Sequence, residues 1–600
     1  MHSHPRELRA MIILAKAAGN LRSLVASLLV CFAVSSASGE VLPLEFSHEW
    51  CGRPVQFTAL AEEGKPSVAR LDYFISGLSL QRMDGSWLDG ASDWAAFISA
   101  SEGRTAAFAD GVPAQDFKAI RFHVGVSAAM NATDPNTITP GSALHPDVNK
   151  LHWGWQGGYV FLALEGHYAK RGKAVGGYSY HLGNDANLMT VELPVALRGA
   201  QPNTIQITLD VAHILDGVDF SRDGASTHSR AGDALAVRLK KNTEGAFQVR
   251  AVKGDAFQEN VAAVVKTTIP PGTTARRLEV SQRLPRIALP ADNPLTDEGV
   301  ALGRRLFHDT RLSVNNTQSC ASCHMQGSAF ADPRKTSTGA EGQTGKRNAM
   351  ALFNLAWQSE FFWDGRAKSL REQVLMPIQD AHEMNENLDR VVAKLSADAD
   401  CAADFAKAFG SGGVTSEHVA KALEQFLLTL VSQDSRFDLA VRKQAEMNES
   451  EKRGLQLFLT EFDPARGLRG ADCFHCHGGT LFTDHQFHNN GLVLAADDVG
   501  RMAVTKNPAD RGKFRAPSLR NISATGPYMH DGRFATLEEV VEHYSTGVQR
   551  SDTLDPNLAK HPEAGLSLTA NEKRDLVAFL KTLTDENFLH PAKPALAAQP

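Results

Sequence analysis

The sequence predicts a multidomain protein, with an N-terminal all-β sandwich domain followed by two mainly α lobes. Three observations lead to this fold class. Short apolar or alternating runs separated by Gly-rich turns recur between residues 41 and 265, as in a β-sandwich. A proline-rich stretch over residues 266–290 then marks a linker between domains. After this linker helical periodicity dominates. The sequence features of the helical part occur twice, over residues 291–435 and 436–590.

Length and composition exclude several classes of protein. At 600 residues the chain has room for about three or four domains. Its composition is that of an ordinary globular protein, without the bias of disordered chains. A net charge of -6 offers no basic surface, so we expect no nucleic-acid partner.

Residues 1–39 are predicted to be a signal peptide. Basic residues precede an apolar run at 24–34, and small residues follow as far as Gly39, where we expect cleavage. The apolar run is too short to span a bilayer comfortably, although a retained N-terminal anchor is an alternative. We therefore expect a periplasmic protein without stable membrane insertion.

The first domain combines predicted strands with scattered histidines. The strand-like runs are 55–60, 71–80, 119–126, 158–165 and 205–211. Histidines spread over a β scaffold can converge on a metal, and imidazole suits copper or zinc. Taken singly, a histidine is more often a surface residue or a hydrogen-bonded core residue than a metal ligand.

Several segments of this domain resemble the MbnP family of periplasmic copper-binding proteins, over most of residues 44–215. They are Phe46-Ser-His48, Tyr73-Phe-Ile-Ser-Gly-Leu, Phe122-His-Val-Gly-Val, Trp153-Gly-Trp155-Gln-Gly-Gly-Tyr159, Glu165-Gly and His181-Leu-Gly. The resemblance implies that copper is bound by His48 and His181, with His213 as a third ligand. A family segment Asn-His-x-Asp reads Asn-Ala-Thr-Asp at 131–134 and lacks its histidine.

Cys51 is a further possible copper ligand. Cys51 could bind Cu(I), pack in the interior, or form a disulfide with Cys401 in an oxidising compartment. The spacing of these two residues in the sequence does not decide between these roles.

Two Cys-x-x-Cys-His motifs dominate the remainder of the chain. They are Cys320-Ala-Ser-Cys323-His324 and Cys473-Phe-His-Cys476-His477. In this pattern two thioether bonds hold a c-type haem and the histidine supplies an axial nitrogen. The alternative, one zinc bound by four thiolates, does not require a histidine after each second cysteine. The sequence therefore predicts two covalently bound haems.

Matching segments around the motifs indicate a duplicated haem lobe. Gly303-Arg-Arg-Leu-Phe and Gly454-Leu-Gln-Leu-Phe precede the two motifs, and a Phe-x-Asp segment follows each, at 330–332 and 482–484. Helical patterns at 415–431 and 570–583 support two related cytochrome c-like lobes.

The haem region resembles the bacterial dihaem peroxidase superfamily, which contains cytochrome c peroxidases and MauG-like enzymes. The segments that carry the resemblance are Asn293-Pro-Leu-Thr, Leu306-Phe-x-Asp309-x-Arg311-Leu-Ser, Phe362-Trp363-Asp-Gly-Arg366, Ala516-Pro-Ser-Leu-Arg520-Asn521 and Pro527-Tyr-Met-His530-Asp-Gly. The resemblance implies a peroxidase-type oxidoreductase that acts on H2O2.

Two features favour the MauG-like branch. Cytochrome c peroxidases carry a distal Met fourteen residues after the histidine of the Pro-Tyr-x-His segment, where this chain has Tyr544. His543 is a neighbouring alternative, but on a helix it would point elsewhere. No histidine occurs between His324 and His382, so the first haem is expected to be open to peroxide.

The resemblance also implies roles for other positions. Gln373, Pro377 and Glu383 match the distal pocket of the peroxide-binding haem, where a carboxylate can move a proton between the peroxide oxygens. His382 is an alternative proton carrier. Trp363 matches the aromatic residue between the haems. A Ca²⁺ site between the haems is matched by Asn348, Thr525 and Pro527, and backbone and amide oxygens suit that ion.

These expectations combine into one functional hypothesis. H2O2 would be cleaved at the His324 haem with help from Glu383, and the oxidising equivalents, shared through Trp363, would oxidise an aromatic residue of a protein. In some bacteria a separate dihaem enzyme, MbnH, converts a Trp of an MbnP-like protein to kynurenine. Because both parts occur in this chain, we expect Trp153 or Trp155 to be oxidised, with Trp50 as a further candidate.

Two alternatives stay open. One is a cytochrome c peroxidase that removes H2O2 with electrons from a small periplasmic redox protein. The other is a copper-binding protein whose haem lobes only transfer electrons.

Overall fold

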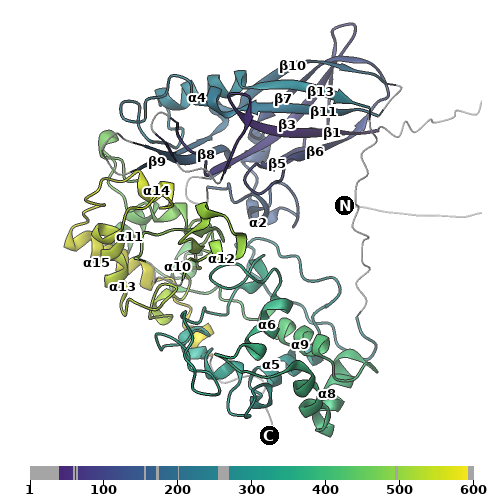
Figure 1. The fold of residues 1–600 in the computed structure, drawn as a ribbon, viewed down its shortest axis with the longest axis vertical. Helices are drawn as coiled ribbons and strands as arrows, with labels where there is room; N and C mark the ends of the chain where they lie inside the picture. The colour runs from purple at the N-terminus through teal and green to yellow at the C-terminus, as the bar shows by residue number, and fades with distance from the viewer. Residues whose placement is uncertain are drawn as a thin grey trace, which may run out of the picture.

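The computed structural model describes most of the chain, namely residues 40–57, 61–62, 65–153, 157–169, 175–199, 202–254, 269–493 and 498–591. The predicted signal peptide and Trp155 lie outside these residues. In Figure 1 the β-rich domain lies at the top, helices α11, α13 and α15 lie below it at the left, and α5, α6, α8 and α9 lie at the bottom. Among the described helices, none is both long and apolar enough to cross a membrane.

One sheet of the β-rich domain has five strands. They are β1 (Glu40–Trp50), β2 (Arg53–Pro54), β6 (Ala106–Val112), β11 (Thr204–Asp210) and β13 (Phe247–Lys253). Their order is β13-β11-β1-β2, and β6 pairs with the free part of β1. β1 runs parallel to β11 with His48 opposite Leu209, so the chain must cross over the other sheet between them.

The other sheet has eight strands. They are β3 (Arg70–Arg82), β4 (Trp87–Asp89), β5 (Ala95–Ser99), β7 (Phe117–Val124), β8 (Val160–Tyr168), β9 (Gly176–Gly183), β10 (Met189–Leu197) and β12 (Ser226–Thr227). The order is β10-β7-β3-β8-β9-β12, with β4 and β5 on β3. β10 alternates strictly between buried and exposed residues, whereas every residue of β8 and β9 is buried. A strand that is buried on both faces needs a second layer, which here belongs to a haem lobe.

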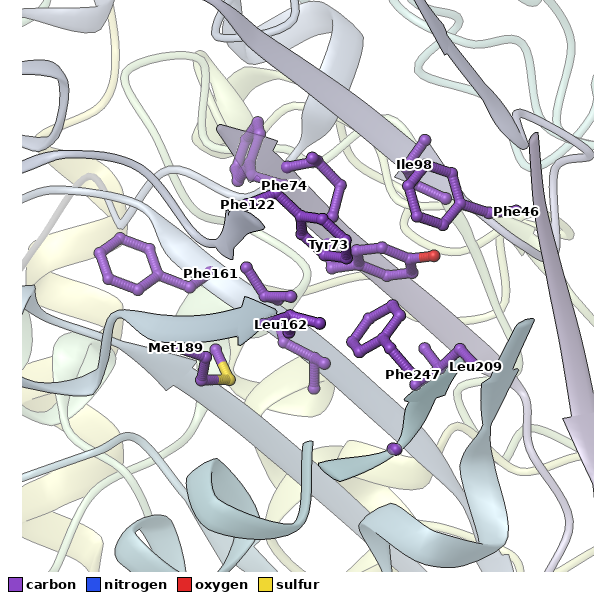
Figure 2. Close-up of a cluster of buried hydrophobic side chains, with 14 of the residues drawn as sticks. Phe46, Tyr73, Phe74, Ile98, Phe122, Phe161, Leu162, Met189, Leu209 and Phe247 are labelled. Carbon is purple, nitrogen blue, oxygen red and sulfur yellow. The ribbon is translucent and has the colours of Figure 1, made fainter. Parts of the chain in front are cut away.

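Aromatic and aliphatic side chains from both sheets form the core of the domain. Figure 2 shows Phe46, Tyr73, Phe122 and Phe247 converging in the space between the strands. Phe122 and Phe247 meet edge to face with ring centroids 5.5 Å apart. Edge-to-face pairs of this kind are favourable beyond the area they bury.

The domain also contains helices that the strand-based prediction omits. They are α1 (Ala128–Asn131), α2 (Pro146–Asn149), α3 (Val211–Ile214) and α4 (Ala234–Gly245). Asp233 caps α4 by accepting hydrogen bonds from the backbone of Leu235 and Ala236.

Four of the five predicted strand runs are confirmed by β3, β7, β8 and β11. The run at 55–60 is wrong in its described part, because residues 55–57 form no strand and 58–60 lie outside the described residues. β2 ends at Pro54, just after a turn in which Cys51 and Gly52 both have positive φ. Pro54 lacks a backbone N–H, which limits further pairing.

The first haem lobe contains five helices. They are α5 (Asp297–Phe307), α6 (Leu370–Gln379), α7 (Leu388–Ser396), α8 (Ala399–Phe409) and α9 (Ser416–Leu428). The second lobe contains α10 (Arg436–Val441), α11 (Glu449–Leu459), α12 (Met502–Thr505), α13 (Leu537–Glu542), α14 (Pro556–Ala559), α15 (Ala570–Lys581) and α16 (Glu586–Leu589), and the short pair β14 (Phe487–His488) and β15 (Phe514–Arg515). The helices predicted at 415–431 and 570–583 correspond to α9 and α15.

The duplication is visible in how the long helices cross. A Cβ on Gly303 of α5 would lie 1.9 Å from the carbonyl oxygen of Ala422 in α9. At the same place in the second lobe, a Cβ on Gly454 of α11 would lie 1.9 Å from the carbonyl oxygen of Asp575 in α15. Each glycine therefore lets two helix backbones approach closely.

The β-rich domain contacts the second haem lobe through β8, β9 and β12. A Cβ on Gly177 of β9 would lie 2.2 Å from the carbonyl oxygen of Pro556 in α14. His167 Nε2 is 2.6 Å from the carbonyl oxygen of Leu554, and Arg466 donates to the carbonyl oxygen of Ser226 at 2.9 Å. This contact supplies the second layer over β8 and β9.

Candidate functional site

The first Cys-x-x-Cys-His motif opens onto a cavity in the first lobe, the first haem cavity. Cys320, Cys323 and His324 line it. His324 Nδ1–H donates to the carbonyl oxygen of Phe330 at 2.7 Å, which orients the ring and leaves Nε2 for iron. Burial lowers the pKa of His324, so the imidazole is neutral near pH 7, the form that binds metals.

The second motif repeats this arrangement in a second haem cavity, lined by Cys473, Cys476 and His477. His477 Nδ1–H donates to the carbonyl oxygen of Phe482 at 3.3 Å. Burial lowers the pKa of His477 to about 4. The Phe-x-Asp segments thus have a structural role, since Phe330 and Phe482 both have positive φ and both present a carbonyl to the histidine.

These residues fit a c-type haem in each cavity. The two cysteines of each motif line the same cavity as their histidine, among mostly apolar side chains. The alternative of one zinc bound by four thiolates is not supported, because within the described parts of the chain no metal-binding group contains all four cysteines.

The predicted distal residues line the first haem cavity. Gln373 and Pro377 belong to α6, and Glu383 lies in the turn that follows it. Burial, together with the Asp380 carboxylate, raises the pKa of Glu383 to about 7, and Arg366 opposes this shift. Glu383 is thus suited to both accept and return a proton at neutral pH.

His382, the alternative proton carrier, differs in its surroundings. Its side chain is 55% exposed, and its Nδ1 lies 3.3 Å from Oδ1 of Asp380. Although it also borders the first haem cavity, its ring is largely in solvent.

Trp363 lies between the two haem cavities and lines both of them. Its indole Nε1–H donates to the carbonyl oxygen of Asn348 at 2.9 Å. The carbonyl group of Trp363 accepts a hydrogen bond from the backbone of Arg515, at 2.8 Å. The ring is therefore held in place by contacts at both its side chain and its backbone.

Tyr544 lines the second haem cavity from a π-helical turn, η11 (His543–Gly547). Turns of this kind are frequent at functional sites. Burial raises the pKa of Tyr544 to about 12, and Asn490 donates to its hydroxyl group at 3.4 Å. The neighbouring His543 bonds through Nε2 to the carbonyl oxygen of Asn490 at 2.9 Å, so it is engaged elsewhere.

Met529 is a second side chain on this wall that the sequence reasoning did not consider as a ligand. Asn490 contacts its Sδ at 3.4 Å as well as the hydroxyl of Tyr544. Both groups therefore lie beside one amide in the second haem cavity.

The three residues predicted for calcium line one cavity. Asn348, Thr525 and Pro527 all border the second haem cavity. Asn348 Nδ2–H donates to the carbonyl oxygens of Arg334 and Lys335, at 3.1 and 3.3 Å. Binding of calcium here stays a prediction.

The predicted trio of copper ligands is not brought together. His48 lies in β1 with Nε2 2.9 Å from the hydroxyl group of Tyr73. His213 is half exposed and lies 3.2 Å from Asp216. The three residues form no common metal-binding group among the described residues, because His48 lies in β1, His213 in α3 and His181 in β9 of the other sheet.

His181 instead meets two other histidines, His228 and His475, at the contact between the domains. One ring nitrogen from each lies within 4.8 Å of the others. The centroids are 5.2 Å apart for His181 and His228, 5.6 Å for His181 and His475, and 5.0 Å for His228 and His475. Burial lowers the pKa of His181, and it lowers that of His475 to about 4.

The sequence reasoning missed His228 and His475. His475 occupies a variable position of the second haem motif, where no residue type is required for haem attachment. His228 follows β12 in a Thr-His-Ser segment that carries no ligand pattern. Only the docking of one domain on the other reveals the group.

The tryptophans differ in their surroundings. Trp153 is 6% exposed and lines a cavity between the domains, the interdomain cavity, with His181, Phe474 and His475. Its ring centroid is 6.2 Å from that of His228. Trp50 is half-buried at the end of β1, opposite Arg53. Trp155 lies outside the described residues.

The two remaining cysteines are not bonded to each other. Cys51 is exposed in the turn after β1, whereas Cys401 is fully buried in α8 of the first haem lobe. The disulfide alternative is therefore wrong for this structure.

Comparisons with known proteins match both halves of the chain. The family model described as "Di-haem cytochrome c peroxidase" matches residues 297–446, and the MbnP model matches residues 39–229. The methylamine utilization protein MauG of Methylorubrum extorquens is 37% identical over 352 residues, which are 57% of this chain and 92% of that protein. The cytochrome c551 peroxidase of Pseudomonas aeruginosa is 33% identical over 301 residues, which are 48% of this chain and 80% of that protein.

A solved structure described as a MauG-like protein associated with microbial copper homeostasis is 38% identical, with a TM-score of 0.48, over 53% of this chain and 98% of that one. The match to the MauG protein spans nearly all of that relative, and the two cavities lined by Cys-x-x-Cys-His motifs agree with it. The chain therefore belongs to the di-haem cytochrome c peroxidase family, as a peroxidase-type oxidoreductase joined to an N-terminal MbnP domain.

Proposed function

We propose that this chain uses H2O2 to oxidise Trp153 of its own MbnP domain to kynurenine, and so prepares that domain for copper. The observation that carries the proposal is the position of Trp153. It lines the interdomain cavity together with Phe474 and His475, which are part of the second haem motif. The indole is thus a neighbour of the haem-attachment loop.

Residues of the second haem motif and the cavity wall connect the two sites. His485 lines both the interdomain cavity and the second haem cavity. Phe474 stacks on His475 with ring centroids 4.3 Å apart. Electrons leaving the indole of Trp153 would therefore cross only a short layer of side chains.

Each haem, held by its Cys-x-x-Cys-His motif, would supply the redox chemistry. Glu383 would take a proton from one peroxide oxygen and deliver it to the other, which is general acid–base catalysis. The pKa of about 7 that burial gives this carboxyl group suits both half-steps at neutral pH. Gln373 and Arg366, on the same cavity wall, would orient the peroxide and favour the charged carboxylate.

Trp363 would serve as the connection between the haem cavities, because it lines both and its ring is fixed by Asn348. Tyr544, which lines the same cavity as His477, would help to hold the second haem through its phenol oxygen. A phenolate favours oxidised iron more than a thioether does, so the second lobe would store oxidising equivalents instead of accepting electrons from a carrier.

The reaction balances with two molecules of peroxide for each tryptophan. Two H2O2 would supply two oxygen atoms to the indole, which gives N-formylkynurenine and two waters. Hydrolysis would then release formate and leave kynurenine. Because substrate and enzyme share one chain, the effective concentration of Trp153 would be of order millimolar.

Two further features complete the proposal. Ca²⁺ would bind between the lobes through oxygen atoms of Asn348, Thr525 and Pro527. The protein would be exported to the periplasm, where haem attachment through Cys-x-x-Cys-His motifs would take place.

The experiment that tests the proposal compares the wild-type holoprotein with Trp153→Phe. With no external donor, the wild type is expected to consume about two equivalents of H2O2 per chain, as the balanced reaction requires, and Trp153→Phe to consume far less. Trp50→Phe is the matched control and should behave as the wild type. Equal consumption by all three proteins, sustained only when a reduced small cytochrome is added, would instead support the peroxidase alternative.

A further inference from the structure

We propose that His181, His228 and His475 form a metal site for copper or zinc that the MbnP domain and the second haem lobe share. His181 comes from β9, and His228 directly follows β12. His475 comes from the 3-10 turn η8 (Cys473–His475), which is part of the second haem motif. The site is therefore incomplete in either domain alone.

The spacing of the rings fits one bound ion. Metal–nitrogen bonds of about 2.0–2.1 Å place the centroids of three imidazoles around one ion roughly 5–5.5 Å apart. The three observed separations are 5.2, 5.6 and 5.0 Å. The side chains of His181, His228 and His475 are 8%, 1% and 3% exposed, so the group is almost dry.

Each histidine has a carboxylate beside one of its ring nitrogens. Glu165 lies 2.8 Å from Nε2 of His181, and Glu461 lies 3.0 Å from Nδ1 of His228. Nε2 of His475 lies 3.1 Å from Oδ1 of Asp472 and 3.2 Å from Nζ of Lys560, so Nδ1 of this ring would be the atom that binds the metal. Metal-binding histidines almost always give their second ring nitrogen to a carboxylate or carbonyl group, which orients the ring and increases its basicity. Hydrogen bonds to carboxylates thus orient His181 and His228, and Asp472 lies beside His475, as expected of histidines around one bound ion.

The charges around the group also favour a cation. Lys560 is shared by Glu461 and Asp472, at 3.4 and 3.2 Å. Arg70 is shared by Glu165 and Asp72, at 3.2 and 2.6 Å. In the part of the chain that the structure describes, these are the Lys and Arg side chains within 4 Å of the three orienting carboxylates. Two cationic side chains thus face four carboxylates. A bound metal ion would balance the negative charge that is left over.

The donor set indicates which metals would bind. Three neutral imidazoles suit copper and zinc, whereas magnesium and calcium prefer oxygen ligands. The interdomain cavity, which His181, His475 and Trp153 line, gives an ion a route of entry and leaves room for a further ligand. This site does not depend on whether Trp153 is oxidised, because none of its three donors is altered by that reaction.

The test uses the full-length protein with both haems attached, never exposed to peroxide. After treatment with a chelator it is titrated separately with Cu(II) and Zn(II), in competition with a chromophoric chelator. Three variants are compared with the wild type: His475→Ala, Glu461→Gln and the control His213→Ala. The haem content of every preparation is measured, since residue 475 is a variable position of the motif and its replacement should leave both haems attached.

The wild type and His213→Ala are expected to bind one Cu(II) or Zn(II) ion with equal affinity. Glu461→Gln should bind about 10- to 100-fold more weakly, the usual effect of removing a residue that orients a ligand. His475→Ala should lose at least about 100-fold, because a ligand itself is removed. The EPR spectrum of the Cu(II) form should show three coupled imidazole nitrogens in the wild type and two in His475→Ala.

The proposal is overturned if the wild type binds no stoichiometric Cu(II) or Zn(II), or if His475→Ala binds as tightly with an unchanged EPR spectrum. Loss of binding in His213→Ala but not in His475→Ala would place the metal with the histidines of the MbnP domain alone, and would also overturn it. If His475→Ala reduces haem attachment, His181→Ala provides the same comparison from the other domain. A failure of Trp153 oxidation would leave each of these results unchanged.

Discussion

The indole ring of Trp153 lies beside the imidazole ring of His228, with their centroids 6.2 Å apart. Through His228 the proposed oxidation target adjoins the three-histidine group, and through Phe474 it adjoins the second haem motif. The residue that would be modified, the candidate metal site and the haem-attachment loop therefore meet at one domain contact.

Glu383 is expected to be the proton carrier for peroxide cleavage. Glu383→Gln should slow the reaction with H2O2 by about 10²- to 10⁴-fold, because a positioned acid–base group contributes that much. Stopped-flow spectroscopy of the haem absorption measures this rate. His382→Ala is the control, since its exposed ring should contribute little, and an equal loss in both variants would contradict the assignment.

The same carboxyl group should govern the pH dependence of that rate. Burial raises the pKa of Glu383 from 4.5 to about 7, so the group is protonated and cannot accept a proton below that pH. The rate should therefore fall about tenfold for each pH unit below the pKa and level off above it. A profile of the wild type that matches that of Glu383→Gln would exclude this titration as the cause.

Tyr544 is expected to bind the second haem iron. Tyr544→Met should raise the reduction potential of that haem, because a thioether stabilises ferrous iron relative to a phenolate. Spectroelectrochemistry measures the potential, and the EPR spectrum of the oxidised protein reports the change of ligand. Met529→Leu, beside the same Asn490 amide, is the matched control. If Met529→Leu altered the spectrum and Tyr544→Met did not, Met529 would be the ligand.

Replacing the glycine at either helix crossing by alanine should lower the stability of the protein. Gly303→Ala and Gly454→Ala would each place a Cβ 1.9 Å from a carbonyl oxygen of the facing helix. Overpacking of this kind costs about 1–3 kcal/mol, more than the gain in helix propensity from alanine. Thermal unfolding followed by circular dichroism should show lower midpoints for both variants.

Gly327→Ala provides the comparison for these two variants, since its Cβ would meet only a carbon of His590 at 3.8 Å. If Gly303→Ala and Gly454→Ala unfolded at the same temperature as Gly327→Ala, the close helix approach would not contribute to stability, which would contradict the prediction.

Local motifs made the haem sites predictable from sequence. The cysteines and histidine of each motif are adjacent in the chain, so their grouping does not depend on the fold. The resemblance to dihaem peroxidases pointed to Gln373, Pro377 and Glu383, which lie on one short segment, α6 and the turn after it, and line the first haem cavity. The role of the Phe-x-Asp repeat emerged only from the structure, where positive φ at Phe330 and Phe482 turns a carbonyl group toward each histidine.

The three-histidine group could not be predicted in the same way. His181 and His228 approach through the pairing of β9 with β12, and His475 reaches them from the other domain. Periodicity identified β8 as a strand, but it could not show that β8 and β9 are covered on both faces by a haem lobe. No local sequence pattern indicates how two domains that are distant in the sequence pack against each other.

The most direct measurement is the peptide-level mass of the haem-loaded protein before and after addition of H2O2. The peptide that contains Trp153 is expected to gain the mass that converts tryptophan to kynurenine, while the peptide that contains Trp50 stays unchanged. The gain should be absent in Glu383→Gln over the same time. An unchanged Trp153 peptide after full consumption of H2O2 would contradict the proposed self-oxidation.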